Sequence, residues 1–170
     1  MDKRILLRPW RRNDLRILTQ LANNFNIWVN LRDRMPHPYN TRHAEAFIAY
    51  CEKQKPIHVF AIECEDEVVG SIGLELKDDV YRISAEIGYW IGEPYWGKGI
   101  ATEAVRQMTD YCFREFPLII RLYAEVFENN KASMKVLEKN GFHMEGIRQK
   151  ALIKNKIILN DWVWVKFRED

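Results

Sequence analysis

The chain has 170 residues, 47% of them hydrophobic and 12% aromatic, and its 26 basic and 24 acidic side chains give a formal net charge of +2. This length and composition are typical of one globular core, so we expect residues 1–170 to form a single domain. Because the charges nearly balance and the basic residues are scattered, direct nucleic-acid binding is not expected. No apolar run is long enough for a membrane span or a signal peptide, which indicates a cytoplasmic protein without a membrane partner.

The three cysteines, Cys51, Cys64 and Cys112, are an odd number and include no C-x-x-C pair. No histidine stands at a metal-ligand spacing from them, which argues against a zinc site as well as a disulfide framework. Each cysteine lies within an apolar pattern, so we expect three buried thiols and no bound metal.

The first half of the chain alternates helix and strand signals. Apolar residues recur at helical spacing after Asn13 or Asp14, whose side chains can cap a helix, and again after Thr41, which we expect to be the N-cap of a longer helix. The two prolines within 35–39 exclude a helix there. The predicted elements, in order, are a strand at 5–7, a helix over 15–21, a short helix near 28–31, a helix over 41–53, and a hairpin with strands at 57–62 and 68–76.

The second half contains the one parallel strand pair that we predict. Strands at 81–91 and 118–126 are joined by a helix from 100 to 114 or 116, and such a crossover makes the two strands parallel neighbours. Asn129 and Asn130 cap a last helix that ends at Gly141, and strands at 142–151 and 157–167 form a closing hairpin. This order predicts an α+β fold with a mostly antiparallel twisted sheet flanked by helices.

Gly97 and Gly99 stand where the strand at 81–91 gives way to the helix from 100. Glycine lets backbone N–H groups approach a ligand closely because no Cβ is in the way. The start of a helix adds N–H groups without intrahelical acceptors and the positive end of the helix dipole. The junction therefore predicts an anion site, and phosphate is the anion that such junctions commonly bind.

Two nucleotide-binding templates fit this loop incompletely. Gly92, Gly97 and Lys98 match a P-loop, but Gly99 stands where that motif has a Ser or Thr hydroxyl for magnesium. Thr102 stands where the dinucleotide pattern has its third glycine, and no further βα units follow. A purely structural glycine turn remains the alternative at this point.

A third template introduces a family resemblance. Trp96-Gly-Lys-Gly-Ile-Ala101 resembles the coenzyme A signature R/Q-x-x-G-x-G/A of the GNAT superfamily of N-acetyltransferases, with Gly99 and Ala101 on the two small positions. Trp96 replaces the usual Arg or Gln. The longer run from Tyr95 to Ala104 is similar to the version in the branch of the ribosomal-protein N-terminal acetyltransferases of the RimJ/RimL kind.

A second motif supports this resemblance. Asn130-Lys-Ala-Ser-Met-Lys-Val-Leu-Glu-Lys-Asn-Gly-Phe142 is similar to the pattern N-x-x-S-x-x-V-L-E-K-x-G-F of the same branch, and it follows the predicted parallel strand. With the segments at 6–9 and 33–39 and Asp161 near the end, the likeness covers nearly the whole chain. Two motifs in the correct order are far more specific than one glycine loop.

The resemblance implies a GNAT-like single domain that uses acetyl-CoA as cosubstrate. In the family the two parallel strands splay apart, and the pantetheine arm enters between them as if it were another strand. Backbone groups of Trp90, Ile91 and Gly92 are then expected to contact pantetheine and the thioester, while N–H groups from Gly97 to Thr102 hold the pyrophosphate. The implied coenzyme contacts are Trp90, Ile91, Gly92, Trp96, Gly97, Lys98, Gly99, Ile100, Ala101, Thr102, Asn130 and Ser133.

Two residues are candidates for the chemistry. An amine must lose a proton to attack a thioester, and Glu86 lies on the strand that leads to the loop, close to where several members carry a catalytic glutamate. Ser133 lies near the coenzyme sulfur in the resembling branch, whereas Leu137 stands where many members have a Tyr acid. The alternatives are a solvent-facing or acceptor-binding carboxylate at Glu86 and a helix cap at Ser133 and Asn130.

The acceptor amine is either a protein N-terminal α-amine, as the branch resemblance suggests, or a small-molecule amine. The segments at 23–39, with Trp28 and Tyr39, and at 147–160 are where we expect it to bind, because family acceptor sites lie over that end of the sheet. The alternative function is a non-catalytic acyl-CoA sensor or binding subunit with the same fold. We expect a monomer or a homodimer.

Overall fold

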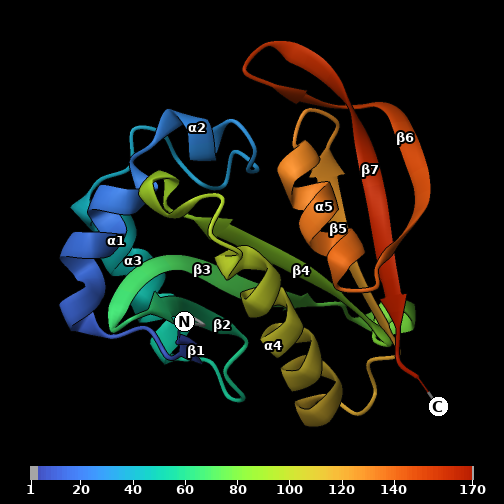
Figure 1. Cartoon of the computed structure of the whole chain (residues 1–170), viewed down its shortest axis with the longest axis horizontal. Helices are drawn as coiled ribbons and strands as arrows, with labels where there is room; N and C mark the ends of the chain where they lie inside the picture. Colours follow the sequence, from blue (N-terminus) through green and yellow to red (C-terminus); the bar gives the residue numbers. More distant parts are fainter. Residues whose placement is uncertain (1–3, 170) are drawn as a thin grey trace. The chain divides into compact units, whose positions relative to one another are not determined.

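The computed structural model of the chain describes residues 4–169 (Figure 1). Hydrogen-bonded strands within this range follow the order β1-β2-β3-β4-β5-β7-β6, and β4 and β5 form the predicted parallel pair. The α+β class with one parallel pair in a mostly antiparallel sheet is thus confirmed. The elements are β1 (Ile5–Arg8), η1 (Arg12–Asp14), α1 (Leu15–Ala22), α2 (Phe25–Trp28), α3 (Thr41–Glu52), β2 (Val59–Cys64), β3 (Glu67–Leu76), η2 (Asp79–Tyr81), β4 (Ser84–Ile91), η3 (Glu93–Tyr95), α4 (Ile100–Glu115), β5 (Arg121–Phe127), α5 (Lys131–Lys139), β6 (His143–Lys154) and β7 (Ile157–Phe167).

The chain divides into two compact units, each described here by itself. The first unit is the chain up to Gly73 together with Tyr89–Ala104, and the second is Leu74–Gly88 together with the chain from Val105 onward. Three elements, β3, β4 and α4, contribute residues to both units. That the whole chain is one domain stays a prediction.

The first unit contains α1 and α3, which lie side by side (Figure 1), and the strands β1 and β2. Its core forms where the apolar faces of these helices and strands meet. Trp90 of β4 is half-buried and packs against this core. The buried residues of the core are Trp10, Leu18, Ala22, Tyr39, Ala44, Ile48, Cys51, Ala61 and Val68.

Two helix starts differ from the prediction. The N-cap of α3 is Asn40 and not Thr41, because the extended backbone of Asn40 lets its side chain accept a hydrogen bond from His43 N at 3.2 Å. The short helix begins at Phe25, before the predicted 28–31, because the Asn24 side chain caps it by accepting from Asn26 N and Ile27 N. In both cases an asparagine just upstream of the apolar pattern determines where the helix begins.

The second unit contains β5, α5 and the long β6–β7 hairpin, drawn from orange to red in Figure 1. Alternate residues of β5 are buried, at Leu122, Ala124 and Val126, as expected for a strand with one face on a core. The helix α5 begins at its predicted cap, because the Asn130 side chain accepts from Ser133 N at 3.2 Å. It ends before Gly141, whose φ of +78° is the left-handed conformation predicted for the stop.

The two parallel strands begin later than predicted. A 3₁₀ turn at Asp79–Tyr81 occupies the predicted start of β4, which begins at Ser84, and β5 begins at Arg121 after a turn in which Ile119 N donates to Phe116 O at 3.0 Å. Both turns contain β-branched or aromatic residues, which favour strands by composition alone. The predicted strands were therefore too long at their starts, because strand propensity alone does not separate these turn residues from strand residues.

The three cysteines are buried and unoxidised, as predicted. Burial raises the pKa of Cys51 to about 12 and that of Cys112 to about 11, so both thiols stay protonated at neutral pH. Within residues 4–169, no helix combines the length and apolar character that crossing a membrane would require.

Candidate active site

The glycine loop joins β4 to α4 through the short turn η3 and two left-handed glycines. Gly97 has a φ of +72° and Gly99 a φ of +77°, and an added Cβ would meet nothing within 4 Å at either position. The requirement for glycine here is therefore conformational, since other residues rarely adopt such φ values. Gly99 O accepts the hydrogen bond from Glu103 N at 3.2 Å, so Gly99 directly precedes the first turn of α4.

Several backbone donors converge at this start of α4. Among the described residues, none accepts a hydrogen bond from the backbone N–H of Gly97, Gly99, Ile100 or Ala101. A helix start with unsatisfied N–H groups next to glycines has the donors and the positive dipole end that bind an anion. The loop therefore has the donors that the predicted phosphate site requires, and phosphate binding stays a prediction.

The loop begins at Gly92, whose backbone is fully engaged. Gly92 N donates to Val69 O at 2.7 Å, and Gly92 O accepts from Tyr95 N at 2.9 Å. A Cβ on Gly92 would lie 2.9 Å from Leu21 Cδ2 and 3.3 Å from Val69 O, so the absence of a side chain lets the loop approach α1 and β3. Gly92 therefore shapes the loop, and its N–H and C=O groups each have a partner in the protein.

Gly70 is a residue that the sequence analysis missed. A Cβ at Gly70 would lie 2.3 Å from Trp90 O and 3.1 Å from Ile91 Cα, so only glycine lets β3 approach this part of β4. The signal was available, because a glycine inside a strand often marks a close backbone approach. Gly70 supports the backbone of the residues predicted to contact the thioester.

Trp96 and Lys98 are both tied to the loop itself. Trp96 Nε1 donates to Ile91 O at 2.7 Å, while 46% of the Trp96 surface stays exposed. Lys98 Nζ donates to Pro94 O at 2.7 Å and lies 5.3 Å from the centre of the Tyr95 ring. Trp96 thus closes the loop at the position where the family signature has Arg or Gln.

Glu86 lies in the second unit, on the last of three parallel residue pairs between β4 and β5, opposite Tyr123. Its side chain is 11% exposed and accepts from Lys77 Nζ at 3.2 Å through Oε2. Lys77 also donates to Glu75 Oε1 at 2.6 Å. The candidate base is therefore a mostly buried carboxylate in an ion pair.

Lys77 and Tyr123 complete this cluster, and the sequence analysis identified neither. Burial lowers the pKa of Lys77, but hydrogen bonds to Glu75 and Glu86 outweigh it, so the pKa of Lys77 is raised and the ammonium persists at neutral pH. The Lys77 ammonium lies 5.8 Å from the centre of the Tyr123 ring. Burial, followed by the charge of Glu86, raises the pKa of Tyr123, so the phenol stays protonated.

The chain is similar to known proteins. The family model of the acetyltransferase (GNAT) domain matches residues 4–143. The chain belongs to the GNAT acetyltransferase family. The family that the two motifs predicted is thus confirmed.

Two GNAT relatives are similar in sequence. The probable N-acetyltransferase YjcK of Bacillus subtilis is 44% identical over 86 residues, which are 51% of this chain and only 47% of that protein. The spermidine N(1)-acetyltransferase of Escherichia coli is 34% identical over 148 residues, which are 84% of this chain and 74% of that protein.

A solved structure confirms the GNAT fold. RimL, a ribosomal L7/L12 alpha-N-protein acetyltransferase in complex with coenzyme A, matches with a TM-score of 0.84 at 20% identity, over 96% of this chain and 93% of that chain. At 20% identity, the RimL match shows the fold.

The predicted GNAT site residues fall into two groups. Trp90 to Thr102 lie together in the first unit, whereas Glu86, Asn130 and Ser133 belong to the second. Within the second unit, Asn130 and Ser133 meet at the start of α5 through the capping hydrogen bond. The capping role of Asn130 is therefore observed, with Ser133 N as the capped donor, and coenzyme contact remains a prediction for both residues.

The two segments expected to bind the acceptor place their side chains in different surroundings. Tyr39 is buried in the core, which raises its pKa to about 12, so it belongs to the fold. Trp28 stacks on His37 with ring centres 5.5 Å apart. In the β6–β7 hairpin, Ile153 and Ile158 face each other across the strands and are 65% and 62% exposed.

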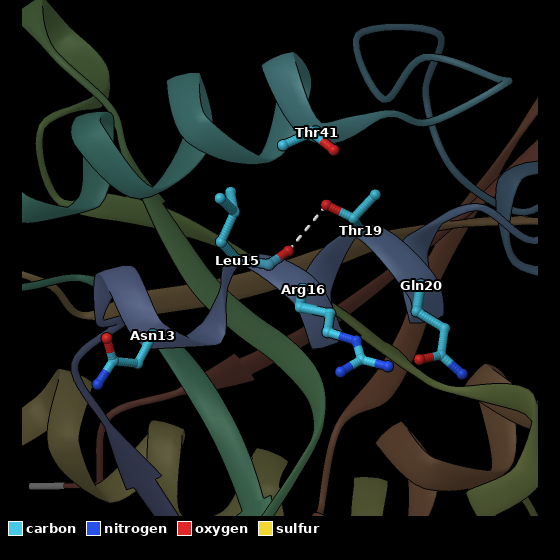
Figure 2. A pocket seen from close by; sticks show the side chains of 6 residues that line it. All are labelled: Asn13, Leu15, Arg16, Thr19, Gln20 and Thr41. Carbon is cyan, nitrogen blue, oxygen red and sulfur yellow. Dashed lines mark hydrogen bonds between the residues drawn. The ribbon is translucent and has the colours of Figure 1, made fainter.

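An open pocket of about 450 Å³ lies elsewhere in the first unit (Figure 2). Thr19 Oγ1 donates to Leu15 O at 2.8 Å along its floor, and the other lining side chains are uncharged except for Arg16. The lining residues are Asn13, Leu15, Arg16, Thr19, Gln20 and Thr41. None of them belongs to the predicted GNAT site.

Proposed function

We propose that this chain transfers an acetyl group from acetyl-CoA directly to a primary amine. The observation that carries the proposal is the stretch from Gly97 to Ala101, around the start of α4, in a chain of the GNAT family. It combines two left-handed glycines with four backbone N–H groups that have no acceptor among the described residues. Such donors suit a pyrophosphate, which offers several charged oxygens to one helix start. Acetyl-CoA supplies the activated acetyl group as its thioester.

Strand geometry supports Ile91 as the residue that contacts the thioester. Successive residues of a strand direct their N–H and C=O groups to alternate sides. Since Gly92 N points to Val69 on β3, Trp90 points the same way, and Ile91 directs its groups to the opposite side. Ile91 N–H is then the donor proposed for the thioester carbonyl, where it would stabilise the developing oxyanion.

Glu86 is the proposed general base. An α-amine has a pKa of about 8 and a lysine amine about 10.4, so either acceptor is mostly protonated at neutral pH. Glu86 accepts one proton of the ammonium, through water, so that the neutral amine nitrogen can attack the carbonyl carbon. The second proton, which the nitrogen loses after the attack, passes to the departing thiolate. Lys77 holds one Glu86 oxygen at 3.2 Å, which fixes the direction of the carboxylate.

Collapse of the tetrahedral intermediate breaks the C–S bond and releases the coenzyme thiolate, which must gain a proton or a hydrogen bond. Ser133, half-buried at the start of α5, is proposed for this role, with Asn130 as a coenzyme contact. A covalent acetyl-enzyme through Cys112 is disfavoured, because this thiol is fully buried and protonated.

We propose that the acceptor is a protein N-terminal α-amine or a small-molecule amine, including polyamines. The relatives support both, since one is named for spermidine and RimL for the α-amine of ribosomal L7/L12. Residues 23–39 and 147–160 remain the proposed acceptor segments. We also propose a cytoplasmic monomer or homodimer that binds neither nucleic acid nor membranes and needs no metal.

Release of free thiol from acetyl-CoA tests the proposal. The chain is incubated with spermidine, other polyamines, amino acids, an aminoglycoside and peptides with different N-termini, and products are read by mass spectrometry. We expect thiol release with a 42 Da acetyl mass gain on one amine class, roughly at the turnover of about 1–10³ per second common for enzymes. Coenzyme binding without release on any amine would favour the acyl-CoA sensor, and absence of coenzyme binding would refute both functions.

A further inference from the structure

The carboxylate of Glu93, at the start of the glycine loop, is held by two asparagines. Asn24 Nδ2 donates to Glu93 Oε2 at 2.6 Å, and Asn26 Nδ2 donates to Glu93 Oε1 at 2.9 Å. Each carboxylate oxygen thus has its own amide donor, although 69 and 67 residues of chain separate the partners. We call these three residues the Asn24–Glu93–Asn26 clamp.

The direction of the Asn24 amide is determined by the helix that it caps. Asn24 Oδ1 accepts from Asn26 N at 2.8 Å and from Ile27 N at 3.2 Å, so this oxygen is committed to the start of α2. The other amide atom, Nδ2, is left to face Glu93 as a donor. One side chain therefore caps α2 and holds the glycine loop at the same time.

Glu93 in turn holds the turn that precedes the two left-handed glycines. Glu93 O accepts from Trp96 N at 3.1 Å, and the neighbouring Gly92 is bonded to Val69. The clamp thus adds a side-chain anchor on α2 to the backbone anchor on β3. Without the clamp, the Glu93 carboxylate would be a mobile negative charge in the loop proposed to bind pyrophosphate.

We propose that Asn24 and Asn26 are positioning residues for coenzyme binding, which hold the glycine loop through Glu93 so that its N–H groups converge on the pyrophosphate. This inference rests on the proposed function. Under this proposal, neither asparagine contacts the coenzyme. Their effect on affinity therefore passes through the Glu93 carboxylate and disappears when the hydrogen bonds are rebuilt with other atoms.

An exchange of donor and acceptor tests the clamp. In Asn24→Asp the new carboxylate faces the carboxylate of Glu93. In Glu93→Gln the new side-chain NH2 group faces the NH2 donor of either Asn24 or Asn26. The double variant Asn24→Asp/Glu93→Gln restores both bonds, since the new amide nitrogen donates to residue 24 and its oxygen accepts from Asn26. Aspartate also remains a good N-cap for α2.

We expect Asn24→Asp to weaken coenzyme A binding about 10-fold and Glu93→Gln about 3-fold, while the double variant returns to within about 2-fold of the wild type. Isothermal titration with coenzyme A gives the affinities. Asn23→Asp is the matched control, because it adds the same charge next to Asn24 and keeps the acceptor for Tyr39 N at 3.0 Å. Losses that add up in the double variant, or wild-type affinity in Asn24→Asp, would overturn the proposal.

Hydrogen exchange of the loop peptide over 92–100, measured without coenzyme, separates this inference from the proposed function. We expect faster exchange in Asn24→Asp and recovery in the double variant. If this pattern appears and the wild type binds no coenzyme A, the proposed function fails while the clamp is real as a loop anchor. If the wild type binds coenzyme A and loop exchange is the same in all variants, the clamp inference fails alone.

Discussion

The glycine loop of the first unit and the Glu86 cluster of the second are held in place by different forces. Hydrogen bonds shape the loop, such as Gly92 N to Val69 O at 2.7 Å, Trp96 Nε1 to Ile91 O at 2.7 Å and the two amide bonds to Glu93, so its backbone donors are held in direction by hydrogen-bonded partners. Glu86 instead depends on the charge of Lys77, 3.2 Å away. A site that binds a ligand already carrying negative charge needs donors in fixed positions. A site that moves a proton needs a carboxylate whose orientation and protonation are controlled by neighbouring charges.

The largest expected effect is the loss of turnover when Glu86 can no longer accept a proton. Glu86→Gln keeps the shape of the side chain but removes its ability to accept a proton, so kcat should fall about 100-fold or more, while the Kd for coenzyme A stays within about 2-fold. Steady-state kinetics and titration separate the two effects. The exposed Glu138→Gln on α5 is the control. An unchanged kcat across the pH range would remove Glu86 from the mechanism.

In the loop, Gly99→Ala should weaken coenzyme A binding about 10-fold with a small effect on acceptor KM. A side chain at a φ of +77° costs about 1–2 kcal/mol and turns the N–H groups away from convergence. Gly146→Ala is the matched control, because nothing lies within 4 Å of its Cβ and its φ is not left-handed. Equal affinities for the two variants would show that the left-handed turn is not needed for coenzyme binding.

Lys77→Met should lower kcat about 5- to 10-fold and leave coenzyme affinity unchanged, because Glu86 loses the partner that orients it. Lys77→Arg should recover most of the activity, and Arg114→Met, which breaks an exposed pair with Glu115, should have no effect. A loss of thermal stability without a change in kcat would show that Lys77 only supports the fold.

The same pair contributes to stability in a defined pH range. The pKa of Lys77 is raised above its ordinary value of 10.5, so its contribution is fully present below about pH 10.5 and is lost as the pH rises through the folded-state value. The stability difference between the wild type and Lys77→Met should therefore stay constant from pH 7 to about 10 and shrink above that, as measured by chemical denaturation.

Ser133→Ala should lower kcat about 5-fold, since a net hydrogen bond to the leaving thiolate is worth about 1 kcal/mol. The backbone N–H of residue 133 still reaches Asn130, so α5 keeps its cap. An acetyl thioester of a more acidic thiol releases a better leaving group, so its turnover should be affected less than that of acetyl-CoA. Undiminished turnover would leave Ser133 with a structural role.

The smallest effect is expected at the position where the loop departs from the family signature. Trp96→Phe keeps the ring but removes the donor to Ile91 O, so the KM for acetyl-CoA should rise about 3-fold with kcat unchanged. Tyr81→Phe, at a residue 69% exposed outside the loop, provides the comparison. A kcat effect larger than the KM effect would indicate that Trp96 also contributes to the reaction step.

Features that depend on a few consecutive residues were predictable from the sequence. The glycines at 97 and 99, the cap at Asn130 and the stop at Gly141 all have the expected conformations, because a cap or a left-handed turn is a local requirement of the backbone. The errors were also local. Asn40 and not Thr41 caps α3, and β4 and β5 begin three residues late, where β-branched and aromatic residues occupy turns.

Residues that act through distant partners were not predictable. Lys77 matters because of Glu86, and Asn24 because of Glu93, which is 69 residues away. For Gly70 the sequence offered a signal, a glycine within a strand, but not its partner Trp90. No propensity or spacing rule joins such positions, since each pairing exists only when two strands or a helix and a loop have come together.

By itself the sequence determined the family, the order of the elements and the loop that precedes α4. Motif spacing, hydrophobic period and glycine conformation all depend on residues that are close together in the sequence. Only the tertiary structure decided which groups are engaged. It showed that the N–H and C=O groups of Gly92 each have a protein partner, that Glu86 is ion-paired, and that Tyr39 belongs to the core. Hydrogen bonds, burial and charge pairs are properties of folded neighbours, and the chain acquires those neighbours only on folding.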